Sequence, residues 1–483
     1  MKPSDTLLDR WAQILARKGN SPAILNPAGE VVRTFRQIDR QARDFERRID
    51  NFQPGSVLAV QIGNHDDWPS ILVACLRREV VVLPLEQSIS EQQRGAALKI
   101  CRAAGIVAAD ARIGRTSITL PPKSPSSPRD ESVRLADRTG ISAATIDWGK
   151  NIPSLLKLTS GTTAAPRAIR FRSEQLLADC DQICDTKGIS DVDLNFGVIP
   201  VSHSYGFSNL ITPLIARGVS MVMSRDRTPR AVLDDLARTN ATVFPGMPVF
   251  YQAFRGMENV PPLPKLRLCI SAGAPLPLVV ANKFRNCFGL PIHSFYGASE
   301  CGGICYDREA KLEIEGYVGA PMNGVDVELI DKSADGSQVQ VRSAAVGDGY
   351  FPGADDEKLG DGIFIPDDLL ARCGDGFKIV GRVSDVINVA GKKVSPAEIE
   401  EALLGFRGVR QATAFGRTAA AGLRNEEIVA CVVGDVEEVA LLEACRKTLS
   451  AWQVPKRIFI VDEIPVNERG KISRRELARQ FRA

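Results

Sequence analysis

Short apolar runs alternate with amphipathic segments along the N-terminal part of the chain, and this alternation constrains the fold more than any other feature. Ser56–Ile62 and Val80–Leu85 have the length and apolar character of buried strands. The segments that follow them, Asp67–Arg77 and Ser88–Cys101, have the spacing of helices. Strands that alternate with helices in this way form a parallel sheet with helices on its faces. The pattern therefore predicts an α/β fold.

The same alternation continues on both sides of these segments. Helices are expected at residues 5–18, Phe35–Ile49, Glu174–Thr186 and Pro277–Phe288, with a further helix and strand within Pro229–Phe244. Strands are expected at Ala23–Leu25, Val31–Thr34, Asn195–Pro200, Leu266–Ser271 and Pro291–Phe295, the first two as a hairpin. The Pro/Ser/Arg-rich stretch from Leu120 to Asp137 has no periodicity and is expected to be a surface excursion.

Beyond Glu300 the pattern changes to short alternating segments, which predict a small antiparallel subdomain. The expected strands are Gly324–Asp331, Ser337–Arg342, Asp361–Leu370, Phe377–Gly381 and Val386–Lys393. Helix Pro396–Leu404 and a compact α+β tail follow. Because 483 residues exceed one ordinary core, we expect two domains: a large N-terminal domain at residues 1–381 and a small, mobile C-terminal domain at residues 382–483.

The composition is that of a soluble globular protein, with 44% hydrophobic and 25% charged residues. A net charge of +3 gives no reason to expect a nucleic acid partner or attachment to a membrane surface. The eleven cysteines show no disulfide framework or zinc spacing, so free thiols in a reducing compartment are expected. Without an apolar leader or an apolar run of about 18 residues, we expect a cytoplasmic protein with no stable membrane insertion.

A small-residue loop, Thr159–Thr163, follows the apolar residues Leu155–Leu158. Glycine permits a close backbone approach to a ligand, and hydroxyl groups next to backbone amides can surround phosphate oxygens. A solvated turn is the alternative for such a sequence. The loop is not a Walker loop, because no Gly-Lys-Ser/Thr closes it.

Several other polar or glycine-rich segments also come directly after expected strands. They include His203, one of three histidines, as well as Gly273 and Tyr296–Glu300. A lone histidine at the end of a strand is usually structural. However, ligands of parallel sheets bind outside the carboxyl ends of the strands, so the convergence of these segments predicts a common site.

Taken together, the segments resemble the motifs of the adenylate-forming superfamily, which includes acyl- and aryl-CoA synthetases, luciferase-like enzymes and peptide-synthetase adenylation domains. The similarity covers the whole chain, follows the family's order and is greatest to the acyl-CoA synthetases. The matching segments are Thr159–Arg167, Pro200–Phe207, Ser271–Leu276, Tyr296–Glu300, Gly316–Gly324, Phe364–Leu369, Gly381–Glu400 and Pro465–Arg474.

The resemblance implies a nucleotide site and a set of catalytic groups. Residues implied to hold ATP are Thr159, Ser160, Gly161, Thr162, Thr163, Arg167, Gly273, Ala274, Tyr296, Gly297, Ser299, Asp368, Arg382 and Lys471. Residues implied to be catalytic are Lys471, Glu300, Thr163 and His203. In this scheme Tyr296 stacks on adenine, Asp368 accepts from both ribose hydroxyls, and Glu300 binds Mg²⁺, which prefers carboxylate and phosphate oxygens. Lys471 bridges the carboxylate and the α-phosphoryl group.

Several positions depart from the family pattern. Ala164 and Arg167 replace the usual glycine and lysine of the phosphate loop, and Pro366-Asp367 stands where Thr-Gly is usual. Ser384 occupies the hinge position, about which the resemblance implies that the tail rotates between the two half-reactions. Asp368 as a plain turn residue and Lys471 as an exposed one are the alternatives to their functional roles.

The expected substrate is a carboxylic acid without an α-ammonium group. No acidic residue lies between Asn195 and Met223, so a free amino acid would leave its ammonium unpaired. An apolar acyl pocket is suggested by Gly206, Phe207, Gly246, Met247 and Ala272, and a fatty and an aryl acid both remain open. The expected acceptor is coenzyme A, with a carrier-protein phosphopantetheine arm as the alternative. Fatty acid metabolism is the expected setting. The other class considered is a non-catalytic adenylate-binding relative; a kinase is disfavoured because its signatures are missing from the sequence.

Overall fold

The structure is a computed structural model that describes residues 5–110, 115–119, 146–158, 167–311, 313–330, 336–353, 358–385, 387–389, 392–418, 426–449, 452–465, 472 and 474–481. The chain divides into two compact units. The first comprises Met1–Val327 and Val341–Phe364, and the second comprises Glu328–Gln340 and Ile365–Ala483. The chain therefore passes between the units within β16 (Val325–Leu329) and β17 (Ser337–Ser343).

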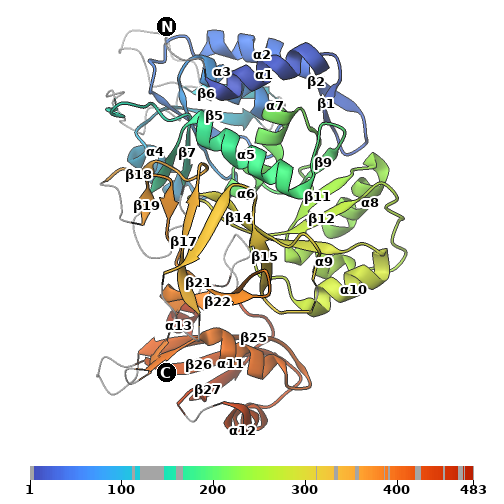
Figure 1. Ribbon diagram of the computed structural model, residues 1–483, viewed down its shortest axis with the longest axis vertical. Helices are drawn as coiled ribbons and strands as arrows, with labels where there is room; N and C mark the ends of the chain where they lie inside the picture. Colours follow the sequence, from blue (N-terminus) through green and yellow to red (C-terminus); the bar gives the residue numbers. More distant parts are fainter. Residues whose placement is uncertain are drawn as a thin grey trace. The chain divides into compact units, whose positions relative to one another are not determined.

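The larger sheet of the first unit is parallel at its centre (Figure 1). Its spatial order is β15-β14-β13-β12-β11-β9-β10-β1-β2. The parallel strands are β1 (Pro22–Leu25), β9 (Leu194–Gly197), β10 (Ser220–Met223), β11 (Val243–Gly246), β12 (Leu268–Ser271) and the first half of β13 (Ile292–Ala298). Antiparallel strands lie at both ends: β2 (Val31–Thr34), β14 (Gly302–Tyr306) and β15 (Tyr317–Pro321).

A second sheet of this unit has the order β18-β8-β7-β4-β3-β5-β6. Its parallel strands are β3 (Val57–Gln61), β4 (Val81–Pro84), β5 (Ala103–Asp110) and β7 (Leu155–Leu158). Its antiparallel strands are β6 (Arg115–Thr119), β8 (Ala168–Phe171) and β18 (Gly349–Phe351). The short strands β19 (Leu359–Gly360) and β20 (Ile363–Phe364) pair with each other, also in the first unit.

The helices of the first unit begin and end at residues suited to those places. Asp5 Oδ1 accepts hydrogen bonds from the amides of Leu7 and Leu8, and Thr34 and Ser90 form capping boxes. The helices are α1 (Thr6–Lys18), α2 (Phe35–Arg48), α3 (Trp68–Arg77), α4 (Glu91–Ile100), α5 (Ser173–Lys187), α6 (Ser204–Gly206), the π-helix η2 (Phe207–Ile211), α7 (Thr212–Arg217), α8 (Pro229–Thr239), α9 (Pro248–Phe254) and α10 (Leu278–Phe288).

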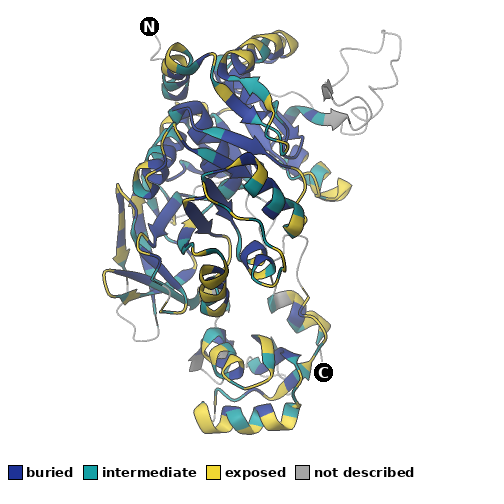
Figure 2. Ribbon diagram, turned by 90° about the vertical axis from the view of Figure 1, so that its right-hand side faces the viewer, coloured by how far each residue is buried: buried dark blue, intermediate teal, exposed yellow. Residues whose placement is uncertain are grey.

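The central strands of both sheets are buried, as their dark colour in Figure 2 shows. Phe196 and Phe244 on the larger sheet pack with Phe250, Phe254 and Phe284 in one apolar cluster. A second cluster lies on the smaller sheet and includes the buried residues Val57, Val81, Leu83, Leu98, Cys101 and Leu156. The helix-covered, largely parallel architecture predicted from the sequence is confirmed.

The second unit is a smaller α+β body. Its strands are β21 (Asp368–Cys373), β22 (Gly376–Arg382), β23 (Ile387–Val389), β24 (Lys392–Val394), β25 (Val409–Thr418), β26 (Glu426–Gly434) and β27 (Arg457–Ile460). Its helices are α11 (Pro396–Leu404), α12 (Glu438–Thr448), α13 (Arg474–Gln480) and a 3₁₀ turn at Val383–Asp385. Strands β25, β26 and β27 form one sheet, whose core includes Ile399, Ala430 and Leu441.

The structure differs from the sequence predictions at several elements. No helix was expected at Ser204–Arg217, but residues 206–216 are all buried, so this helical stretch lacks the amphipathic pattern that reveals surface helices. Strand β13 continues past Phe295 to Ala298, because its second half pairs with the antiparallel β14. The single strand expected at Val386–Lys393 is the hairpin of β23 and β24, and the β5–β6 pair was not expected. The surface excursion expected at Leu120–Asp137 lies outside the described residues.

Candidate active site

The parallel strands of the larger sheet end side by side. The register pairs Gly246 with Ser271, and Ser271 with Ser294. The chain therefore leaves neighbouring strands at one edge, into the segments that begin at Met247 and Ala272. Carboxyl ends of parallel strands are where ligands bind in such sheets. This geometry brings together the segments that the sequence singled out after β11, β12 and β13.

His203 begins the helical stretch that follows β9. Its Nδ1 accepts a hydrogen bond of 3.4 Å from the backbone amide of Tyr205, and its amide donates to the carbonyl of Pro200 at 3.0 Å. His203 is therefore held as the N-cap of this helical stretch by its ring and by its backbone amide.

Asn64 fixes the segment that leads from β9 to His203. Its Nδ2 donates to the carbonyls of Gly197, Ile199 and Ser224 at 3.1–3.2 Å, and its Oδ1 accepts from the amide of Val201 at 3.0 Å. The side chain is 4% exposed, so these bonds replace water for backbone groups that are also buried. The sequence analysis missed this residue, because a single asparagine between a strand and a helix also fits an ordinary turn.

The residues expected to form the acyl pocket are mostly packed. Phe207 is 1% exposed, and a Cβ on Gly206 would lie 2.1 Å from the carbonyl oxygen of Pro200. Gly206 therefore lets the helix approach the backbone. The Tyr205 ring lies 5.7 Å from that of Phe295, and its hydroxyl is buried with no hydrogen-bond partner in the described ranges. Burial raises the pKa of Tyr205 well above its ordinary value.

Glu300 lies in the turn between β13 and β14. Its Oε1 accepts a hydrogen bond of 3.3 Å from the Tyr350 hydroxyl, and its carbonyl accepts from the amide of Gly347 at 2.9 Å. The Arg167 guanidinium lies 4.0 Å from the centre of the Tyr350 ring, a cation–π contact. The structure thus brings Arg167 and Glu300 to the same tyrosine, which comes from β18 and was not among the predicted site residues.

The residues implied to surround adenine lie on and beside β13. Tyr296 is in the strand rather than in a loop after it, and is 7% exposed. A Cβ on Gly297 would lie 2.5 Å from the carbonyl oxygen of Gly302, so the two strands approach closely there. Gly273 has a φ of +86°, a conformation that favours glycine. Ala274 is exposed, and Ser299 is half-buried.

In the second unit, Asp368 and Arg382 are neighbours. They face each other across β21 and β22, and Arg382 Nε donates to Asp368 Oδ1 at 2.6 Å. Asp368 is 9% exposed, so this charge-assisted bond stabilises a carboxylate that is largely removed from water. Asp368, implied to accept from the ribose hydroxyls, therefore pairs in this structure with Arg382, which is also implied to hold ATP.

Other predicted site residues lie outside the described part of the chain. They are Thr159, Ser160, Gly161, Thr162, Thr163 and Lys471, together with Ala164. The backbone of Ser384 is described, within the 3₁₀ turn, but its side chain is not.

Among the described residues of the first unit, two lysines are buried, which is uncommon. Lys187 Nζ donates to Asn209 Oδ1 at 2.8 Å and lies 3.4 Å from the centre of the Phe295 ring. Burial lowers the pKa of Lys187 to about 7. Lys157, on β7, is 6% exposed with its Nζ 4.4 Å from the centre of the Phe171 ring, and burial lowers its pKa as well.

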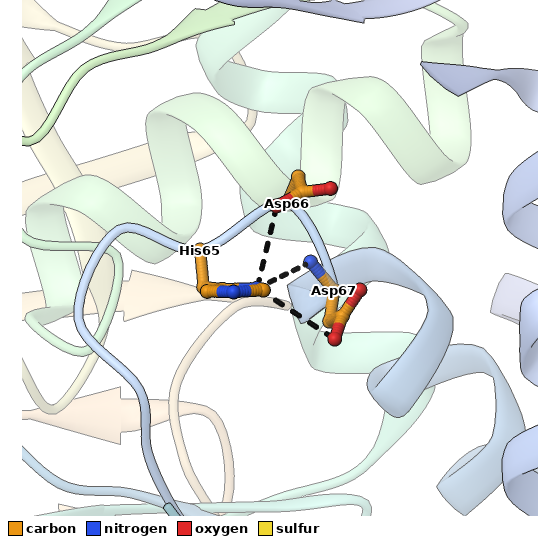
Figure 3. A group of neighbouring side chains, drawn as sticks. All are labelled: His65, Asp66 and Asp67. Carbon is orange, nitrogen blue, oxygen red and sulfur yellow. Dashed lines mark hydrogen bonds and ion pairs between the residues drawn. The ribbon is translucent and has the colours of Figure 1, made fainter. Parts of the chain in front are cut away.

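In the part of the chain that the structure describes, one cluster of potential metal ligands lies just before α3: His65, Asp66 and Asp67 (Figure 3). His65 Nδ1 already accepts a hydrogen bond of 3.2 Å from the amide of Asp67. Arg33 lies 2.7 Å from Asp66 and 3.9 Å from Asp67, so a guanidinium already balances these carboxylates. The cluster is accounted for by these contacts and is not assigned to a metal.

Comparison with known protein families decides the classification. The model of the AMP-binding enzyme family matches residues 9–351, and that of the AMP-binding enzyme C-terminal domain matches residues 398–471. The chain belongs to the AMP-binding enzyme family. The resemblance to adenylate-forming enzymes that the sequence motifs indicated is thereby confirmed.

Individual relatives cover most of the chain at low identity. A probable CoA ligase of Humulus lupulus is 28% identical over 468 residues, which are 89% of this chain and 87% of the relative. A 3,4-dihydroxybenzoate–[aryl-carrier protein] ligase of Bacillus anthracis is 27% identical over 329 residues, 67% of this chain and 73% of that protein. The solved structure of ATP-bound MatB from Rhodopseudomonas palustris covers 98% of both chains with a TM-score of 0.82 at 22% identity, which supports the fold. None of the helices in the described ranges has both the length and the apolar character to span a bilayer.

Proposed function

We propose that the protein is an AMP-forming carboxylic acid–CoA ligase, an enzyme that adenylates its acid and then transfers the acyl group to a thiol. The observation that carries this proposal is the match of both AMP-binding family models along one chain. The edge of the larger sheet, where the segments after β11, β12 and β13 meet, supports a nucleotide site in the first unit.

The first half-reaction joins the acid to AMP. A carboxylate oxygen attacks the α-phosphorus of ATP, and the bond between that phosphorus and the pyrophosphate oxygen breaks. Lys471 and the loop Thr159–Thr163 would neutralise the charge on the phosphates, because cationic and amide donors preorganised around a developing charge lower the barrier.

Mg²⁺ would accompany ATP at Glu300. A carboxylate accepts at two oxygens, so the hydrogen bond from Tyr350 to Oε1 is compatible with an ion on the same side chain. A hard oxygen donor is also the ligand type that Mg²⁺ prefers, and the ion would screen the phosphate charge.

In the second half-reaction a thiol sulfur attacks the acyl carbonyl carbon, and the bond from that carbon to the AMP oxygen breaks. We place coenzyme A as the thiol, in line with the similarity to a probable CoA ligase from Humulus lupulus. The similarity to an aryl-carrier protein ligase favours a second candidate, in which the acceptor is a phosphopantetheine arm on a carrier protein.

The acid would be a fatty or aryl carboxylate. The segment from Asn195 to Met223 has no acidic residue to pair with an α-ammonium. Fatty acid metabolism would be the setting if a fatty acid is used, and the free cysteines support the cytoplasm.

The tail would serve both half-reactions in turn. With a boundary at residues 381/382, rotation about Ser384 presents Lys471 to the first unit for adenylation and the segment at Gly391 for thioester formation. Such motions are common where two chemical steps share one site.

A panel of carboxylates tests the proposal. Pyrophosphate release from ATP and Mg²⁺ is measured with fatty, hydroxylated aryl, plain aryl and α-amino acids, with and without coenzyme A. We expect release with a fatty or aryl acid, and thioester only when coenzyme A is present. If none of the acids in the panel supports pyrophosphate release, a non-catalytic relative is favoured. A preference for an amino acid would overturn the substrate assignment.

A further inference from the structure

Lys187 lies where three elements of the first unit meet. It is the last residue of α5 and is 5% exposed. Its Nζ donates a hydrogen bond of 2.8 Å to Asn209 Oδ1 in the π-helix η2, and lies 3.4 Å from the centre of the Phe295 ring on β13. A buried ammonium needs such partners, because removal of an unpaired charge from water is costly. The lysine side chain therefore joins η2 to β13.

The Asn209 side chain continues this connection into the helical stretch that begins at His203 (the His203 stretch). Its Nδ2 donates to the carbonyl of Tyr205 at 2.9 Å. Because a backbone carbonyl only accepts, Oδ1 is the atom that faces Lys187. The amide of Tyr205 in turn donates to His203 Nδ1 at 3.4 Å. A continuous series of contacts thus runs from the lysine through Asn209 and Tyr205 to the imidazole.

Asn209 is itself fixed within the core. It is 2% exposed, and its carbonyl accepts a hydrogen bond of 3.0 Å from Asn195 Nδ2 on β9. It lies in a π-helix, a rare form that is frequent at functional sites. A buried amide in this position has little freedom to rearrange, since its polar atoms would lose their partners. A displacement of Lys187 therefore acts on Tyr205 and is not absorbed by Asn209.

The second contact of Lys187 reaches the strand that holds Tyr296. Phe295 directly precedes Tyr296 in β13 and is 8% exposed. The Phe295 ring contacts the lysine ammonium and also the ring of Tyr205, whose centre lies 5.7 Å from its own. Cation–π contacts and aromatic pairs of this kind are attractive and depend on geometry. Strand β13 and the His203 stretch are thereby joined to the same lysine.

We propose that Lys187 is a positioning residue that holds the His203 stretch at a fixed position relative to Tyr296. This inference rests on the proposed function, with the acid bound along the segment Asn195–Met223 and adenine stacked on Tyr296. Lys187 does not touch either substrate in this scheme. It sets the relation between the two sides of the site, from which the carboxylate and the α-phosphorus must meet. Because small misplacements of reacting groups slow a reaction strongly, the effect should lie in catalysis and not in ATP binding.

The experiment measures three quantities for Lys187→Met: the kcat of adenylation at saturating acid and ATP, the Kd for ATP, and the rate of thioester formation from supplied acyl-AMP and coenzyme A. Assays at about pH 6.5 keep the wild-type lysine protonated, because burial lowers its pKa to about 7. We expect the adenylation kcat to fall by about tenfold to a hundredfold, because two separate substrates lose their alignment. ATP binding and thioester formation should change by less than about threefold, since ATP alone and the already joined acyl-AMP need no such alignment.

The matched control is Lys18→Met. Lys18 is likewise the last residue of a helix, α1, and its Nζ donates to the carbonyl of Gly218 at 3.0 Å and lies 5.8 Å from the centre of the Phe35 ring. It makes the same kinds of contact as Lys187, but with residues outside the His203 stretch and β13. Lys18→Met should therefore leave the adenylation kcat of the folded enzyme within about twofold of wild type.

Phe295→Leu tests whether the two contacts of Lys187 act together. It removes the ring on β13 and keeps the lysine and its acceptor Asn209. The double variant Lys187→Met/Phe295→Leu should lose no more than about threefold beyond the worse single variant, because both changes break the same connection. If Lys187→Met does not fold, Phe295→Leu alone decides, and the same selective loss of adenylation kcat is expected.

The possible results separate the role of Lys187 from a general loss of structure. Equal losses in all three quantities for Lys187→Met, or a loss of the same size in Lys18→Met, would overturn the proposal. Losses that multiply in the double variant would show independent roles and would overturn it as well. An adenylation kcat within about twofold of wild type in Lys187→Met, with an active wild type, would refute the role of Lys187 alone. A wild type that forms no acyl-AMP with any acid of the panel would refute the proposed function, and with it this role.

Discussion

Replacement of Lys187 by methionine is expected to reduce the dependence of stability on pH. Burial lowers the pKa of Lys187 from its ordinary value of 10.5 to about 7. Between these pH values the unfolded chain holds a proton that the folded protein has released, so the free energy of unfolding rises with pH. The buried Lys187 ammonium destabilises the folded protein fully below about pH 7 and no longer above about pH 10.5. At roughly 1.4 kcal/mol per pH unit, this destabilisation amounts to about 5 kcal/mol.

Methionine has a similar volume and does not titrate, so the contribution of Lys187 to this slope should vanish. From about pH 7 to pH 9 the wild type should gain about 2 kcal/mol more stability than Lys187→Met. The variant also leaves Asn209 Oδ1 without the 2.8 Å hydrogen bond from Lys187. That loss costs about 1–3 kcal/mol at every pH, so the difference between pH values is the informative quantity.

Urea unfolding at about pH 7, 8 and 9, followed by the fluorescence of the buried Trp11 and Trp68, measures this difference. The matched control is Lys265→Met, which removes a lysine that is exposed in the same unit. Its slope should equal that of the wild type. If wild type and Lys187→Met have parallel pH dependences within about 0.5 kcal/mol, the ammonium is not desolvated as the structure implies, and the reasoning from burial to pKa is refuted.

Three further changes test other parts of the account. Lys471→Ala is expected to lose about two to three orders of magnitude in adenylation and to keep thioester formation from supplied acyl-AMP, which separate assays of the half-reactions would measure; equal losses in both would refute an alternating tail. Asp39→Ala removes the acceptor of the 3.0 Å hydrogen bond from Trp11 Nε1 and the carboxylate that pairs with Arg77. Chemical unfolding should therefore show a free energy of unfolding lower by about 3 kcal/mol. A decrease under about 1 kcal/mol would contradict a buried pair. Gly206→Ala places a Cβ 2.1 Å from a carbonyl oxygen and should lower the stability of the fold by about 1–3 kcal/mol. Gly95→Ala is the control, because the space around its Cβ is open, and it should stabilise α4. Thermal unfolding of both variants measures these effects.

The elements that sequence alone revealed are those with a local pattern. Helices α1 and α2 have one apolar face, and helix α11 begins at Pro396 and ends before Gly405, so spacing and end signals were sufficient. The helical stretch from Ser204 to Arg217 was missed because it is buried on all sides and has no polar face.

In the candidate site, too, residues within local motifs could be proposed from the sequence, whereas residues that depend on tertiary contacts could not. His203, Glu300 and Asp368 could be proposed from the sequence because each lies within a short segment that resembles a family motif, and their roles stay predictions. Asp179 was not assigned a role, because its contact with Gly303 depends on α5 and the β13–β14 turn meeting in space. An aspartate in a helix and a lysine in a strand have no local signature of burial.

Oxygen transfer from the acid to AMP tests the central claim most directly. If a carboxylate oxygen attacks the α-phosphorus, an acid labelled with ¹⁸O in both carboxylate oxygens leaves one labelled oxygen in the AMP that is released when the thioester forms. Mass spectrometry of AMP and pyrophosphate from a reaction with ATP, Mg²⁺, coenzyme A and an accepted acid measures this. We predict one ¹⁸O atom in each AMP and none in pyrophosphate. Unlabelled AMP, or label in phosphate or pyrophosphate, would contradict adenylation of the acid by this protein.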